Sequence, residues 1–178
     1  MTDRIVIDAC VFVSATQRVL TVGAARAGLF QPVWSARIFE EWTRAAGRQG
    51  HALKAEARTD QALLTSAFPN GCVPATEAYA GRFHLPDPDD VHVLAAAVAG
   101  GAGALLTANT RDFPLRVMAA AGILRRHPDE FLLEIGLSAP EVLRPLIAAH
   151  HEAVGSGRSP RTFLRRSGLA RLGKWYAP

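Results

Sequence analysis

The stretch Leu85–Pro114, LPDPDDVHVLAAAVAGGAGALLTANTRDFP, indicates the fold because polar residues bracket two apolar segments. The run Pro86-Asp-Pro-Asp-Asp90 has the character of a helix start, with a capping aspartate, an early proline and two acids at the positive end of the helix dipole. The apolar residues after it predict a buried helix over 88–99 that ends at a glycine pair. Residues 103–107 are short and apolar, which favours an interior strand of a parallel sheet.

Acidic and amide side chains follow two of the predicted strands. Asn109 and Asp112 come after strand 103–107, and Asp8 comes directly after the apolar strand predicted over 4–7. In open parallel sheets, ligands bind beyond the carboxyl ends of the strands. A buried carboxylate costs free energy unless a cation or several donors compensate it. Asp8 therefore has either a structural partner, such as Arg111, or a metal ion.

A third acid lies on the helix predicted over 36–46, which Ser35 can cap. At ~100° per residue, Glu40 projects away from the apolar stripe of this helix, whereas Glu41 lies at its edge. Glu41 is thus the better candidate for a half-buried functional group, although an ordinary position on the flank of the helix explains it too. The stripe comprises Ile38, Phe39, Trp42, Ala45 and Ala46.

Strand and helix patterns alternate as far as about residue 126, which predicts an α/β fold with three α/β/α layers and a central parallel sheet. Beyond it we expect only helices: a short one from Pro128, a longer one opened by the capping box Ser138-Ala-Pro-Glu141, and a last one from Ser159-Pro160. The predicted domains are therefore 1–127 and a helical C-terminal extension, 128–178. Strands are expected at 4–7, 32–34, 72–74, 103–107 and 122–126, and helices in the first domain at 17–28, 36–46, 52–67, 88–99 and 114–121.

Length and composition favour a compact intracellular protein. The chain has 178 residues, of which 49% are hydrophobic, enough to bury a full core. No apolar run has the length of a membrane span and the N-terminus lacks the pattern of a signal segment, so we expect a cytoplasmic protein without membrane contact. Cys10 and Cys72 have no metal-ligand spacing and are expected to be reduced thiols in the core.

Charge is distributed unevenly along the chain. No acid follows Glu152, whereas six basic residues do, which leaves 14 basic and 16 acidic residues before that point. A basic tail with interleaved aromatic residues suits the phosphate backbone of RNA, but a solvated face or a surface for an acidic partner explains it equally well. The six basic residues are Arg158, Arg161, Arg165, Arg166, Arg171 and Lys174.

Four motifs, taken in order, resemble the acidic motifs of PIN-domain ribonucleases. They are Asp8 after an apolar strand, the run from Ser35 to Glu41, Asp90 at the start of an alanine-rich helix, and the run from Thr107 to Pro114. The resemblance covers most of the first 135 residues. Within this group the chain is similar to VapC-type toxins of bacterial toxin–antitoxin modules, including longer ones with a helical C-terminal extension.

The resemblance implies a metal-binding quartet of Asp8, Glu41, Asp90 and Asp112, with Asn109 as an auxiliary polar group and Asp87 as an extra ligand. Carboxylate ligands suit Mg²⁺ or Mn²⁺, and the lack of a Cys/His set argues against zinc. The chain departs from the family where Ala9 and Cys10 replace a hydroxyl residue and an Asn, and where Asn109 replaces an acid found in some relatives. One firmly bound ion is therefore expected.

Each acidic residue also has a simpler interpretation. Asp87 is well placed to cap the helix, and Asp89 to be a solvated charge in its first turn. Asp112 can be a turn residue before Phe113-Pro114. What favours the functional interpretation is that all four quartet positions are predicted at the same end of the sheet.

The sequence thus predicts a metal-dependent endoribonuclease that hydrolyses RNA, the toxin of a toxin–antitoxin pair, with a cognate antitoxin and a homodimeric state implied by the resemblance. The alternative is a catalytically silent RNA- or protein-binding module of the same fold. A phosphatase-like hydrolase with Asp8 as nucleophile is disfavoured, because it needs a second aspartate where Cys10 stands.

Overall fold

A five-stranded parallel sheet forms the centre of the protein, in a computed structural model that describes residues 3–74 and 81–177. The strand order is β3-β2-β1-β4-β5, so the first strand lies in the middle of the sheet. This arrangement confirms the predicted α/β fold with a central parallel sheet. The strands are β1 (Arg4–Ile7), β2 (Gln31–Ser35), β3 (Cys72–Val73), β4 (Ala104–Leu106) and β5 (Leu124–Arg126).

The middle strands are apolar because helices cover both of their faces. Val6 pairs with Val33 of β2 on one side and with Leu105 of β4 on the other, and all three side chains are fully buried. Such a strand cannot alternate polar and apolar residues. This register aligns the carboxyl ends of β1 and β4, where Ile7 pairs with Leu106.

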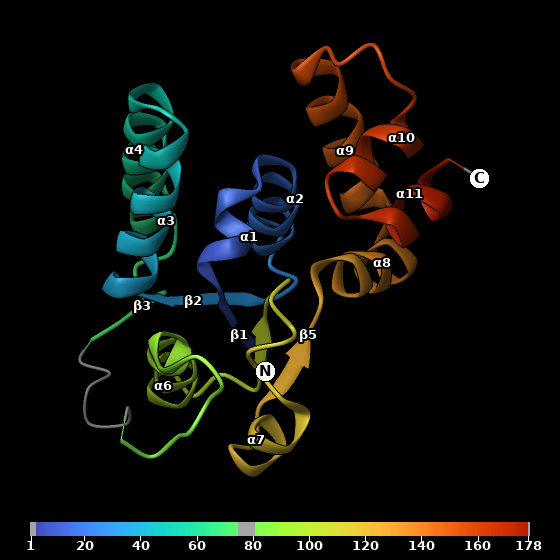
Figure 1. Ribbon diagram of the computed structural model, residues 1–178. Helices are drawn as coiled ribbons and strands as arrows, with labels where there is room; N and C mark the ends of the chain where they lie inside the picture. The colour runs from blue at the N-terminus through green and yellow to red at the C-terminus, as the bar shows by residue number, and fades with distance from the viewer. Residues whose placement is uncertain (1–2, 75–80, 178) are drawn as a thin grey trace.

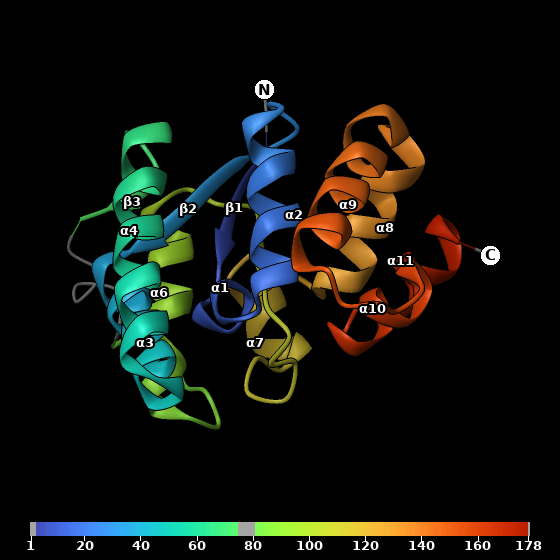
Figure 2. The same ribbon diagram turned by 90° about the horizontal axis from the view of Figure 1, so that it is seen from above.

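Helices lie on both faces of the sheet, which gives three layers (Figures 1 and 2). One face carries α1 (Ala9–Val13), α2 (Ala15–Arg26), α3 (Ala36–Gln49) and α4 (His51–Ala67), and the other carries α6 (Val91–Ala99) and α7 (Leu115–Ala120). Aromatic rings join the first group to the sheet, with Phe12 stacked on Trp42 and Phe39 stacked on Trp34.

The predicted helices differ from the observed ones at their starts. The five-residue helix α1 was not expected, and α2 begins at Ala15 because Ser14 accepts a hydrogen bond from the Gln17 amide and caps it. The helix predicted over 88–99 is a 3₁₀ turn, η1 (Pro88–Asp90), followed by α6. Asp90 therefore stands at the junction of two helical segments rather than inside one helix.

Four helices complete the chain beside α2: α8 (Pro128–Ser138), α9 (Pro140–Val154), α10 (Pro160–Arg166) and α11 (Ala170–Tyr176). Their apolar side chains, Leu132 and Leu172 among them, belong to the same buried cluster as the sheet. The expected capping box at Ser138 is wrong, because its hydroxyl donates back to the Glu134 carbonyl and Ser138 ends α8. Where one last helix was predicted from Ser159-Pro160, the structure has two, α10 and α11, which are separated at Gly168, where φ is +78°. The boundary at residues 127/128 stays a prediction.

Two further expectations concern the surface and the membrane. Cys10 is half-buried, but Cys72 is exposed, so the prediction of a core thiol is wrong for Cys72. The cause is that Cys72 lies in β3 at the edge of the sheet, with only β2 beside it. Within the described parts of the chain, no helix is both long and apolar enough to cross a membrane.

Candidate functional site

Polar side chains gather at the carboxyl ends of β1 and β4. Asp8 directly follows β1, and its backbone amide donates a hydrogen bond of 3.0 Å to the Leu106 carbonyl at the end of β4. Residues 107–112 leave the sheet at the same edge. The parallel register therefore brings Asp8 and the Asn109–Asp112 turn together although about a hundred residues separate them in sequence.

Asp8 is 6% exposed and is held by two neutral donors. Thr107 donates its hydroxyl to Oδ2 at 2.7 Å, and the Cys10 thiol donates to the same oxygen at 3.1 Å. Burial raises the pKa of the Asp8 carboxyl, an effect that these two hydrogen bonds and one from the Ala9 backbone oppose. In the described residues no salt bridge reaches Asp8, so the proposed pairing with Arg111 is wrong.

Cys10, one of the positions where the chain departs from the family pattern, supplies a hydrogen bond to Asp8. Burial and the neighbouring Asp8 charge raise the pKa of its thiol to about 12, so the sulfur keeps its proton and acts as a donor. It also accepts a hydrogen bond from the Ala108 amide at 3.3 Å. The thiol therefore both donates and accepts a hydrogen bond, as a hydroxyl would, and it links the segment after β1 to the turn after β4.

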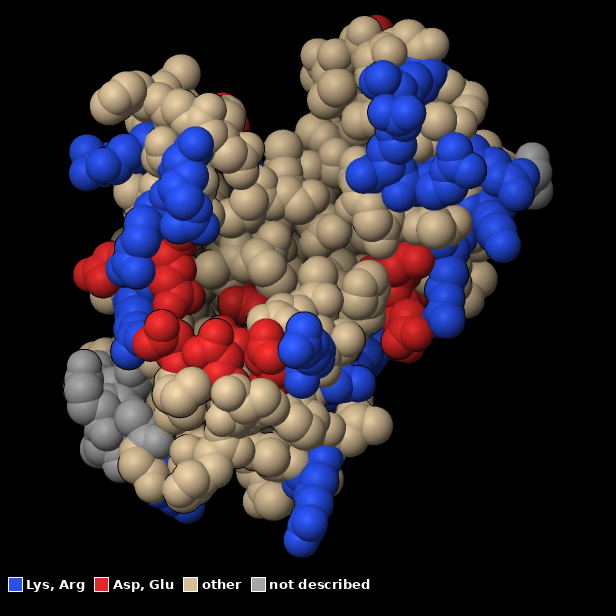
Figure 3. Space-filling view, in the orientation of Figure 1, with Lys and Arg blue, Asp and Glu red and all other residues tan. Residues whose placement is uncertain are grey.

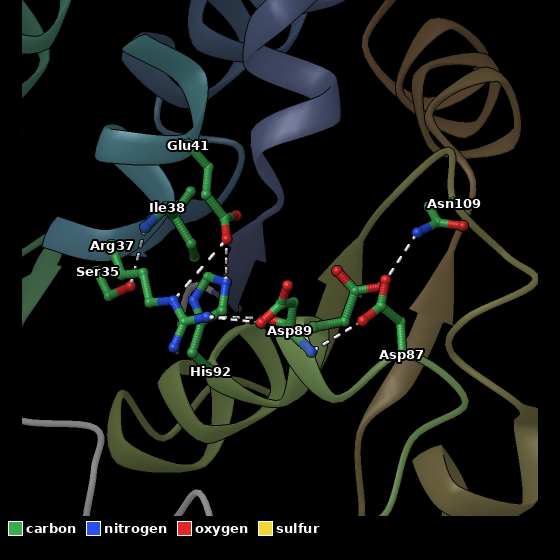
Figure 4. A network of polar contacts seen from close by, with 9 residues as sticks. Ser35, Arg37, Ile38, Glu41, Asp87, Asp89, His92 and Asn109 are labelled. Atoms are coloured by element: carbon green, nitrogen blue, oxygen red, sulfur yellow. Dashed lines mark hydrogen bonds and ion pairs between the residues drawn. The ribbon is translucent and has the colours of Figure 1, made fainter. Parts of the chain in front are cut away.

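Asp90 stands at the centre of the acidic group. Burial, and to a smaller extent the charges of Asp8, Asp87, Asp112 and Glu41, raise the pKa of its carboxyl to about 7. Asn109 donates a hydrogen bond from Nδ2 to Asp90 Oδ2 at 3.2 Å (Figure 4). The structure thus brings the five acids proposed from the sequence close enough for their charges to act on one another, with Asn109 beside them.

Glu41 reaches the site from α3, on the other side of the sheet from α6. It extends from α3 toward α6, where Nε2 of His92 lies 2.7 Å from its Oε1 (Figure 4). Arg37, one turn earlier on α3, places its Nε 3.9 Å from the same oxygen. Glu41 is half-buried, as its place at the edge of the apolar stripe predicted.

His92 was missed as a site residue. It is 4% exposed, and it is the only polar residue in the otherwise apolar helix α6. A histidine on such a helix is most often a core residue, and its partner lies 51 residues away, so the sequence around it carries no sign of the contact. Its position two residues after Asp90 was the one available signal.

The simpler interpretations hold for two of the acids. Asp87 accepts a hydrogen bond from the Asp89 amide at 2.9 Å and so caps η1, and its carboxylate is exposed. The Asp89 side chain is 89% exposed and pairs with Arg37 at 3.5 Å. Asp87 therefore acts on Asp90 through its charge while it serves as a cap.

The turn that carries Asp112 is anchored from β5. Arg125 donates from Nη1 to the carbonyls of Thr110 at 2.6 Å and of Phe113 at 2.8 Å, and the Phe113 side chain is fully buried. These contacts hold both ends of the turn around Asp112. Arg125, which sequence reasoning did not single out, is therefore a structural support of the site.

Seen from outside, the acids form a group in the hollow between the α3–α4 hairpin and the C-terminal helices, with basic side chains on both walls (Figure 3). Carboxylate oxygens are the donors that Mg²⁺ and Mn²⁺ prefer, and the charge gathered around Asp90 favours a cation. The donor set therefore fits a divalent ion. Among the residues that the structure describes, no three Asp, Glu, His or Cys side chains converge as a formed metal site.

The fold and this group of acids define the class: an α/β protein with a carboxylate cluster at the carboxyl edge of a parallel sheet. A family model for the PIN domain matches residues 4–111, more than half of the chain, and the protein belongs to this family. PIN domains are usually nucleases, and they typically use divalent metal ions. The matched range contains Asp8, Glu41, Asp90 and Asn109 and ends just before Asp112. No curated protein and no solved structure gives a significant match.

Proposed function

We propose that the protein is a metal-dependent endoribonuclease that hydrolyses phosphodiester bonds of RNA. One observation carries the proposal: burial and the charges of four other carboxylates together raise the pKa of Asp90 to about 7. Such repulsion destabilises the folded protein unless the site works with a positive charge. Together with membership of a nuclease family, this favours a site for a divalent cation and a phosphate group.

Each side chain has a part in this proposal. Asp8, Glu41, Asp90 and Asp112 would hold the ion, and Asp87, exposed on its cap, would contribute charge or an outer contact. Thr107 and Cys10 fix Asp8, and Asn109 orients Asp90. The bound Mg²⁺ or Mn²⁺ would supply an activated water and stabilise the charge on the phosphate. The water oxygen would bond to phosphorus as the P–O3′ bond breaks, and the 3′ oxygen would take up a proton, leaving a 5′-phosphate and a 3′-hydroxyl.

The C-terminal helices support RNA as the substrate. Their basic side chains lie on the same face of the molecule as the acidic hollow (Figure 3). Of the six basic residues after Glu152, Arg171 pairs with Glu130 at 2.6 Å. The other five take part in no salt bridge among the described residues. Arginines that are not neutralised can bind phosphates along a single strand that leads to the acids. The five are Arg158, Arg161, Arg165, Arg166 and Lys174.

We also propose the finer role of a toxin in a toxin–antitoxin pair, with a cognate antitoxin, a homodimeric state and a cytoplasmic location. The similarity of the motifs to VapC-type toxins supports it. Induction of the wild-type gene alone should arrest growth of a bacterial host, and induction of an Asp90→Asn gene should not. Normal growth with active, soluble wild-type protein would favour a housekeeping nuclease instead.

The central experiment measures Mn²⁺-dependent cleavage of single-stranded RNA. Asp8→Asn and Asp90→Asn should each abolish cleavage while the protein stays folded, because the amide loses the charge but keeps the shape. Asp89→Asn is the matched control, since Asp89 lies beside Asp90 but is 89% exposed at its side chain, and it should cleave normally. Wild-type rates in both site variants would refute the assignment. RNA binding without Mn²⁺ binding or cleavage in the wild type would favour the silent RNA-binding module.

A further inference from the structure

His92 has an arrangement that the proposed reaction does not explain. It lies in the first turn of α6, is 4% exposed, and makes a polar contact across the layer boundary to Glu41 on α3. Its other ring nitrogen, Nδ1, is buried and finds no hydrogen-bond partner in residues 3–74 and 81–177. A buried polar atom without a partner costs about 1–3 kcal/mol, so a purely structural histidine is a poor choice at this position.

The ring geometry decides which nitrogen carries the proton. With an acceptor 2.7 Å from Nε2 and none near Nδ1, the hydrogen belongs on Nε2, which donates to Glu41 Oε1. The ring lies in a buried stretch of α6, where Val93, Leu94 and Ala95 next to it in sequence are fully buried. His92 is therefore a buried donor to one oxygen of the half-buried Glu41 carboxylate.

Arg37 is the second partner of Glu41 and competes with His92 for the same oxygen. Its guanidinium lies 3.9 Å from the same Oε1, is half-exposed, and is also tied to Asp89 on the outer side of the site. Both contacts that the described residues make with Glu41 fall on Oε1. The short hydrogen bond from His92 outweighs the long ion pair with Arg37 and keeps Glu41 turned toward α6 and Asp90.

We propose that His92 is the positioning residue of the metal site: it holds Glu41 by Oε1 so that Oε2 remains available as a single-oxygen ligand. This inference rests on the proposed function, because it assumes that Glu41 binds the ion. Hydrogen-bonded partners of ligating carboxylates commonly set metal affinity by a factor of about 10 to 100. His92 touches neither the substrate nor the reacting atoms in this role.

The test is Mn²⁺ binding to the full-length, RNA-free protein by calorimetry, with two variants of similar size. The amide nitrogen of a glutamine can occupy the place of Nε2, whereas that of an asparagine reaches only the place of Nδ1. His92→Gln should bind Mn²⁺ within a few-fold of wild type, and His92→Asn about 10- to 100-fold more weakly. Equal binding by His92→Asn and wild type would overturn the proposal, and so would equally weak binding by both variants, which indicates packing alone.

A double-mutant cycle separates this inference from the proposed function. If His92 acts through Glu41, then His92→Asn should weaken binding no further in a Glu41→Gln background, and additive losses would contradict the inference. If the wild type does not bind Mn²⁺ at all, the proposed function fails first. Imidazole nitrogen shifts of wild-type His92 offer a check without any variant: a proton on Nε2 is expected, and a proton on Nδ1 alone would overturn the proposed hydrogen bond.

Discussion

Two buried aspartates, one at the sheet edge and one among the C-terminal helices, show how differently the fold treats the same side chain. Asp8 is 6% exposed and Asp129 is 7% exposed. Asp129 lies on α8 and accepts hydrogen bonds of 2.9 Å from the backbone amides of both Arg171 and Leu172, the first turn of α11. Asp8 has a hydroxyl and a thiol as its side-chain donors, a backbone hydrogen bond from Ala9, and the charge of Glu41 acting against its own.

The difference indicates that Asp129 contributes to stability, whereas Asp8 is suited to bind a ligand. The amides that bind Asp129 are fixed dipoles at the positive end of a helix, so its charge stabilises the packing of α11 on α8. Burial, with a smaller contribution from the charge of Glu41, raises the pKa of the Asp8 carboxyl and so favours loss of its charge. A fold keeps such a group where a ligand, rather than the protein, supplies the compensation.

Replacing each of the two aspartates should give the largest difference in the free energy of unfolding. Asp129→Ala leaves two backbone amides of α11 without acceptors and should lower the free energy of unfolding by about 2–4 kcal/mol in urea denaturation. Asp8→Asn should lower it by less than about 1 kcal/mol, because the amide relieves repulsion among the acids. The opposite order of the two losses would contradict the comparison.

Metal binding should sharpen the contrast next. At a Mn²⁺ concentration a hundred times its dissociation constant, the free energy of unfolding of the wild type should rise by about 2.7 kcal/mol. Asp129→Ala should show the same gain from its lower starting point, since its site is intact. Asp8→Asn should show none, and an equal gain in Asp8→Asn would place the ion elsewhere.

A smaller effect follows from Asp90. Its carboxyl has a pKa raised from 3.8 to about 7 in the folded protein, so between these values the folded state holds a proton that the unfolded state has lost. Stability of the metal-free protein should therefore fall as the pH rises from about 4 to 7. Asp90→Asn should flatten this part of the stability curve relative to Asp89→Asn, which should follow the wild type. Identical slopes in all three proteins would show that Asp90 titrates normally.

The smallest effect concerns the basic helices. Arg161→Gln and Arg165→Gln should each weaken RNA binding a few-fold and reduce the dependence of log affinity on log salt by about one unit. The cleavage rate at saturating RNA should not change, because neither residue lies among the acids. An unchanged affinity in the double variant would favour an acidic protein partner for α10.

Local patterns were enough to predict much of the site. An acid directly after an apolar strand or at a helix start has a recognisable setting, and Asp8, Asp90 and the half-buried Glu41 lie where these settings indicated. The assignment of these residues as metal ligands is still a prediction. The parallel sheet also followed from local patterns, since only strands covered on both faces are apolar throughout.

What the sequence did not predict depends on contacts between distant segments. The partner of His92 lies 51 residues away, and those of Asp129 lie 42 and 43 residues away, with no local sign of either. Ser138 failed as a cap for the opposite reason: the motif was present, but Ser138 is the last residue of α8 and its hydroxyl donates to the Glu134 carbonyl of that helix. Helix starts in a row of short helices thus depend on where the preceding helix ends.

The hydrogen bonds of Asp129 also bear on the order in which the protein is made. Synthesis from the N-terminus completes all five strands by Arg126, so the acids of the sheet can assemble while the remainder of the chain is still on the ribosome. Asp129 is made next, but the amides that donate to its carboxylate, those of Arg171 and Leu172, are added only more than forty residues later. The hydrogen bonds that join α8 to α11 therefore form only when nearly the whole chain has been made, and a prematurely terminated product would carry the acidic edge of the sheet without them.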